Sequence, residues 1–205
     1  MSEPNYLSDH EAILRLARRF PRRYLLLGSG PRLQYADPER AIAETLALLR
    51  GADTERLLLI FGGDSADAAR PDLGHLMQRV KATLGERAEL LSLQSWSEPC
   101  PFAEHIFIYP REFSDGAAPR ELWGGTVDGA PVAATRYYLS PELQELLSAV
   151  LCIGGGEIAK QELRYAIEQG RVRHHYLSAA ARYPRGGDPY GPAHAWYVTR
   201  RSERD

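Results

Sequence analysis

The fold of this chain is decided by a stretch that reads AVLCIGGGEIAKQEL, residues 149–163. The apolar run at 149–153 is typical of a strand buried on both faces, as in a parallel sheet. Three glycines follow it at 154–156, and the pattern of residues 157–169, closed by Gly170, predicts a helix. A strand that passes through a glycine turn into a helix is the repeating unit of α/β folds.

The same order of strand, glycine turn and helix occurs twice earlier. Residues 24–27 read YLLL and lead into Gly28-Ser29-Gly30. Residues 57–61 read LLLIF and lead into Gly62-Gly63. This alternation predicts an α/β fold with a Rossmann-like, open, mainly parallel sheet and helices on both faces. The expected strands are residues 24–27, 57–61, 88–93, 106–109, 149–153 and 172–180, and the expected helices are residues 8–19, 38–50, 72–84, 157–169 and one that begins at Pro141.

Capping residues mark the starts of these helices. Ser8, followed three residues later by Glu11, predicts a capping box for the first helix. Asp37 and Ser140 each precede a proline, which suits the first position of a helix.

Two regions interrupt the alternation. We interpret residues 110–135 as an insertion or lid, in which Asp128-Gly129 predicts a hairpin. The last residues are rich in proline, glycine and charge, which predicts a surface tail with a short edge strand at 195–199. The expected organisation is one domain, residues 1–205, with a Rossmannoid core at about 22–182, the insertion at about 110–135 and the tail at 183–205.

The composition excludes several classes of protein. Of the 205 residues 44% are hydrophobic and 25% charged, which suits one buried core, and no apolar run approaches the roughly 18 to 20 residues that span a bilayer. The first residues lack the pattern of a secretory signal, so we expect a cytoplasmic protein with no membrane contact. The net charge of -2 argues against dedicated nucleic-acid binding. Cys100 and Cys152 fit no zinc motif, and we expect neither a metal nor a cofactor.

The glycine turns are the candidate binding site. Ligands of open parallel sheets bind outside the carboxyl ends of the strands, so the three turns should line one crevice. Glycine lets backbone N–H groups approach an oxyanion, and a helix that begins next to it adds partial positive charge, which suits phosphate. The alternative is that the glycines only turn the chain. The candidate ligand-binding residues are Gly28, Ser29, Gly30, Gly62, Gly63, Asp64, Gly154, Gly155 and Gly156.

The common nucleotide and hydrolase motifs are absent from the sequence. A dinucleotide fingerprint would need glycine at Leu33 and an acid about 20 residues after the first glycine, whereas Asp64 lies 36 residues after Gly28. There is no Gly-Lys-Ser or Gly-Lys-Thr of a P-loop. Leu27 stands where a hydrolase elbow around Ser29 needs glycine.

The segment at 149–163 resembles the strand, Gly-Gly loop and glutamate-bearing helix of the LOG-like Rossmannoid superfamily. Gly28-Ser29, and Gly62-Gly63 with the later Gly74-His75-Leu76-Met77, resemble its other motifs in the same order. The resemblance covers roughly residues 24–180. The superfamily holds nucleoside-monophosphate phosphoribohydrolases, often misnamed lysine decarboxylases, and the SLOG ligand-sensing domains, so it implies a small nucleotide-like ligand.

The resemblance also implies three catalytic candidates, Glu157, Glu162 and Arg136. The enzymes carry Pro-Gly-Gly-x-Gly-Thr-x-x-Glu, but Ile153 replaces the proline here, and the Gly-Thr is missing. One register places Glu162 on the second glutamate of that motif, and the other leaves Glu157 as a local substitute. Arg136 lies near the position of the family's substrate-binding arginine. In N-glycosidic cleavage a carboxylate stabilises the oxocarbenium-like transition state while an acid assists the leaving base.

The alternative is that none of these three residues takes part in catalysis. In that case Glu157 is an ordinary first-turn residue, Glu162 is a solvated charge on the helix and Arg136 is a surface arginine. One candidate function is a sensor or regulatory module that binds a nucleotide or nucleotide-derived signal without the need to turn it over. The competing function is a phosphoribohydrolase-type hydrolase. A third is an interaction module whose glycine loops are only turns. The aromatic residues Trp123, Tyr137 and Tyr138 could serve a homodimer or cover the pocket.

Overall fold

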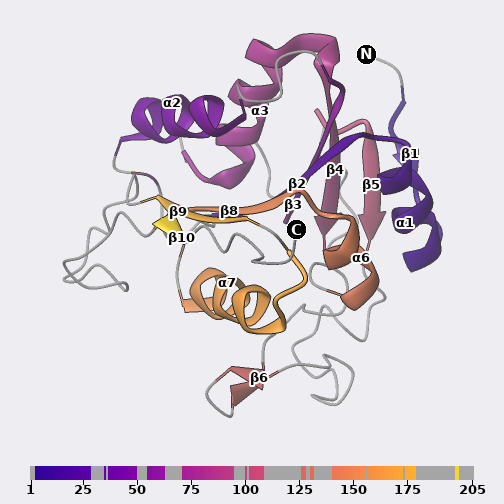
Figure 1. The fold of residues 1–205 in the computed structure, drawn as a ribbon. Helices are drawn as coiled ribbons and strands as arrows, with labels where there is room; N and C mark the ends of the chain where they lie inside the picture. The colour runs from indigo at the N-terminus through magenta and orange to yellow at the C-terminus, as the bar shows by residue number, and fades with distance from the viewer. Residues whose placement is uncertain are drawn as a thin grey trace.

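The described part of the chain builds an eight-stranded sheet with helices on both faces (Figure 1). The computed structural model describes residues 3–28, 35, 37–49, 55–62, 71–94, 100, 102–108, 126–127, 130–131, 140–155, 157–172, 174–178 and 197–198. The strand order is β1-β5-β4-β3-β2-β8-β9-β10. Neighbouring strands are parallel except β9 and β10, so the expected open, mainly parallel α/β fold is confirmed.

The elements lie close to the segments that the sequence predicts. The strands of the sheet are β1 Asn5–Tyr6, β2 Arg22–Gly28, β3 Leu57–Gly62, β4 Ala88–Gln94, β5 His105–Ile108, β8 Ala149–Ile153, β9 His175–Ser178 and β10 Tyr197–Val198. The helices are α1 His10–Arg18, α2 Pro38–Leu49, α3 Leu73–Leu84, α6 Pro141–Leu146 and α7 Glu157–Gln169, with a 3-10 turn η2 at Gly85–Arg87. The expected edge strand at 195–199 is present as β10.

The insertion contains the expected hairpin. Strands β6 Thr126–Val127 and β7 Ala130–Pro131 pair antiparallel, with Val127 opposite Ala130. Most of 110–135 and of 183–205 lies outside the described residues. In the part that the structure describes, no helix is long and apolar enough to cross a membrane.

The order of the strands reverses at β2. From β2 the sheet extends through β3 and β4 to β5, whereas β8 and β9 lie on the other side of β2. Helix α2, which follows β2, packs on one face, and α7, which follows β8, packs on the opposite face. The carboxyl ends of β2 and β8 therefore form a topological switch point, where open α/β sheets bind ligands.

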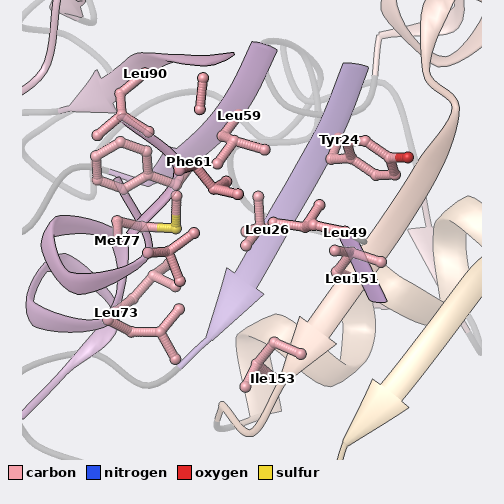
Figure 2. Close-up of a cluster of buried hydrophobic side chains, with 14 of the residues drawn as sticks. Tyr24, Leu26, Leu49, Leu59, Phe61, Leu73, Met77, Leu90, Leu151 and Ile153 are labelled. Carbon is pink, nitrogen blue, oxygen red and sulfur yellow. The ribbon is translucent and has the colours of Figure 1, made fainter. Parts of the chain in front are cut away.

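Alternate strand residues supply the two apolar layers. Leu26 and Phe61 face α2 and α3, and Figure 2 shows Met77 of α3 beside Phe61. Leu25 and Ile60 face the layer formed by α1, α6 and α7. Both faces of the central strands are thus covered, which explains why these strands read as continuous apolar runs.

The N-terminal segment differs from the expectation. The predicted cap, Ser8, is wrong: Asp9 caps α1, and its carboxylate accepts the N–H of Ala12 at 2.7 Å. The Ser8 hydroxyl donates to Asp9 at 2.8 Å instead, because the helix begins later than the capping box implied. Strand β1 was not expected, since two residues carry no periodicity. It forms on the edge of β5, where the Asn5 N–H donates to the Glu104 carbonyl at 2.8 Å.

Candidate functional site

The glycine turns after β2 and β8 meet at the switch point. Gly28 ends β2 and is the register partner of Ile153, which ends β8. Gly154 and Gly155 follow with φ of 67° and 102°, and α7 begins two residues later. Gly62 ends the adjacent parallel strand β3, so the described glycines lie at the same edge of the sheet, as expected.

The space beside these glycines is filled by the protein itself. A Cβ on Gly155 would lie 2.5 Å from the Cβ of Ala159 and 3.1 Å from the carbonyl oxygen of Gly28. A Cβ on Gly28 would lie 2.5 Å from the Tyr35 hydroxyl and 2.8 Å from Leu73. Both glycines are therefore needed for packing at the switch point. Neither position leaves room for a ligand in place of the missing side chain.

Tyr35 joins the connections at this edge, and the sequence reasoning missed it. Its hydroxyl donates to the Ile153 carbonyl at 2.7 Å, and its N–H donates to the Pro71 carbonyl at 2.8 Å. Only 3% of the residue is exposed. The available clue was a lone aromatic residue in the short segment between the strand at 24–27 and the helix at 38–50, which carries no periodicity.

Glu162 is buried on α7, so its reading as a solvated helical charge is wrong. It is 5% exposed and shares the buried side of the helix with Ala159, Leu163 and Ala166. Among the described residues none forms a hydrogen bond or ion pair with it. Burial raises the pKa of Glu162 from the usual 4.5 to about 8. At neutral pH the carboxyl of Glu162 is therefore protonated and uncharged, and it can act as a hydrogen-bond donor.

The helices α3 and α7 differ in the residue that precedes their first turn. α3 begins after Asp72, whose buried carboxylate accepts the N–H of His75 at 3.1 Å and caps the helix. Burial is the main influence on the pKa of Asp72 and raises it, although the backbone N–H groups act in the opposite direction. α7 begins after Gly156, which has no side chain to cap the helix. Among the described helices, α7 is thus the one whose preceding residue has no side chain that could cap the first turn.

The other predicted residues are not placed. Ser29, Gly30, Gly63, Asp64, Arg136 and Gly156 lie outside the described residues. Glu157 begins α7, but only its backbone is described. Across the described ranges, no group of three or more His, Cys, Asp or Glu side chains could hold a metal ion. No protein-family model, curated protein or solved structure matches the chain.

Proposed function

We propose that this chain binds a phosphate-bearing nucleotide, or a ligand derived from one, at the carboxyl ends of β2 and β8, as a sensor or regulatory module. The switch point supports this site, because the connections leave there toward opposite faces of the sheet. The resemblance to LOG-like and SLOG proteins points to the same class of ligand.

The start of α7 carries the proposal. Helices α1, α2, α3 and α6 each have a side-chain oxygen that accepts an N–H of the first turn, from Asp9, Asp37, Asp72 and Ser140 respectively. α7 follows a glycine instead, and it begins beside the ends of β2 and β8. The N–H groups in the first turn of a helix have no partner within the helix, and together with the helix dipole they favour an anion at such a position. A phosphate group would supply the acceptor oxygens that a glycine at 156 lacks.

A second candidate function is hydrolysis of an N-glycosidic bond, and the burial of Glu162 favours it. A carboxyl that keeps its proton at neutral pH can protonate a departing base as a general acid. It cannot at the same time stabilise positive charge in the sugar as a carboxylate. A hydrolase would therefore need a second carboxylate to stabilise the positive charge on the sugar, and Glu157 is the nearest candidate along α7.

Binding is tested by thermal unfolding in the presence of AMP, adenosine and inorganic phosphate. AMP at 100 times its Kd should stabilise the protein by about 2.7 kcal/mol. Adenosine should stabilise it much less, because it lacks the anion. Equal shifts for AMP and adenosine, or none for either, would contradict the proposal.

A pair of variants tests the role of α7 directly. Gly156→Asp supplies a capping carboxylate like those of α1, α2 and α3, and it should weaken AMP binding at least tenfold by competing with phosphate. Gly156→Ala adds a side chain without an oxygen and is the matched control. If both variants bind AMP as the parent does, the phosphate does not lie at the start of α7.

The hydrolase reading is tested by release of free base from AMP. If base is released, Glu162→Gln should lower turnover about 100-fold and leave affinity within about threefold, because proton donation matters in the transition state. Turnover should also fall as the pH rises past about 8, where Glu162 loses its proton. Absence of base release would contradict the hydrolase proposal.

A further inference from the structure

We propose that Tyr35 is a positioning residue of this site, which holds the turn after β8 against the connections that follow β2 and β3. The inference rests on the proposed function for its ligand. It assigns to Tyr35 a role that the glycine motifs do not describe.

Tyr35 links the three connections that follow β2, β3 and β8. The residue belongs to the loop between β2 and α2, its hydroxyl donates to Ile153 at the end of β8, and its N–H donates to Pro71 just before α3. The hydroxyl lies 2.5 Å from the position that a Cβ on Gly28 would take, too close for both to be present. Gly28 thus makes room for this hydroxyl at the carboxyl end of β2.

The hydrogen bond from Tyr35 to Ile153 lies at the end of β8, where the regular strand pairing stops. Ile153 is the last residue of β8, and the next two residues, Gly154 and Gly155, have positive φ. Their conformation is therefore not that of a strand, and glycine gives them little rigidity of their own. A buried hydroxyl that donates to the carbonyl just before them fixes where the turn begins. The start of α7, where the proposed phosphate would bind, follows two residues after Gly155.

The closest control is another tyrosine of the same apolar cluster. Tyr24 lies in β2, at the opposite end from Gly28, and is 9% exposed (Figure 2). Tyr24→Phe and Tyr35→Phe each remove one tyrosine hydroxyl from that cluster. Only the second removes a donor to the turn after β8. Urea unfolding establishes that both variants fold and how far each is destabilised.

Two measurements then test the role. In the ligand-free protein, amide hydrogen exchange at Gly154 and Gly155 should speed up about tenfold in Tyr35→Phe, with no such change in Tyr24→Phe. In calorimetric titrations, Tyr35→Phe should weaken AMP binding about tenfold, and Tyr24→Phe should leave it within twofold.

The outcomes separate this inference from the proposed function. If the parent does not bind AMP, the proposed function fails, and exchange at the two glycines alone decides whether Tyr35 holds the turn. Unchanged exchange in Tyr35→Phe overturns the inference in either case. If exchange rises but AMP binding stays at the parental level, Tyr35 is a structural residue and does not position the ligand. Equal losses of affinity in the two variants would also overturn it.

Discussion

The buried carboxyl of Glu162 makes the stability of this protein fall with rising pH, and Glu162→Gln should remove that dependence. The folded protein keeps the proton of Glu162 up to a pKa of about 8, whereas the unfolded chain loses it near 4.5. Between these values the folded state binds more protons than the unfolded state. The free energy of unfolding therefore decreases as the pH rises through this window, and the full contribution is present below the lower value.

The size of the effect follows from the two pKa values. Each pH unit inside the window costs about 1.4 kcal/mol, so the contribution of Glu162 should fall by about 3 kcal/mol between pH 5 and pH 7. Glutamine has nearly the shape of the protonated acid and does not titrate. Any cost of burying its amide is the same at every pH. The free energy of unfolding of Glu162→Gln, relative to that of the parent, should therefore increase as the pH rises.

The assay is urea unfolding at pH 5, 6, 7 and 8, with the free energy of unfolding obtained by linear extrapolation. Glu142→Gln, at the exposed first turn of α6, is the matched control for the same substitution outside the core. Comparing variants with the parent cancels the contributions of other groups, such as Glu89. If the parent and Glu162→Gln curves stay parallel across this range, Glu162 ionises as it does in the unfolded chain, and the reasoning from burial is wrong.

Three further predictions concern packing and capping, and urea unfolding at pH 7 checks each. Gly155→Ala should lower the free energy of unfolding by more than about 2 kcal/mol, because its Cβ meets Ala159 and its φ is positive. Gly170→Ala, with positive φ but open space, should lower it by about 1 kcal/mol, and equal losses would contradict the packing argument. Asp72→Ala should cost about 1 to 2 kcal/mol through loss of the α3 cap, and a loss below about 0.3 kcal/mol would show that the cap is unimportant. Met77→Ala should cost about 2 to 5 kcal/mol, since this fully buried side chain fills the layer beneath α3, and a smaller loss would mean that the layer collapses around the gap.

The elements of the fold were predictable because their causes are local. The run at 149–153 has the apolar pattern of a strand buried on both faces, and it forms β8. Asp37 and Ser140 cap helices that begin one residue later, as their positions before proline indicate. The meeting of Gly28 with Gly154 was also predictable, because parallel strands place their carboxyl ends at one edge of a sheet.

The order of the strands was not contained in these patterns. Several parallel strands of similar apolar composition can pair in more than one order, and nothing local places β8 beside β2 and not beside β5. That choice depends on which helix layer covers each strand, and hence on contacts between segments far apart in the chain. The position of the switch point, and with it the site, is a property of the tertiary structure.

The sequence by itself determined the α/β class, the strand and helix segments, the helix caps Asp37 and Ser140, and the glycines at one edge of the sheet. Only the tertiary structure decided that Glu162 is a buried acid and that Tyr35 joins three connections. It also decided that the room beside Gly28 and Gly155 is taken by Tyr35 and Ala159. The physical reason is that propensity and capping act over a few neighbouring residues, whereas burial, pKa and close contact depend on whatever the folded chain brings alongside a residue.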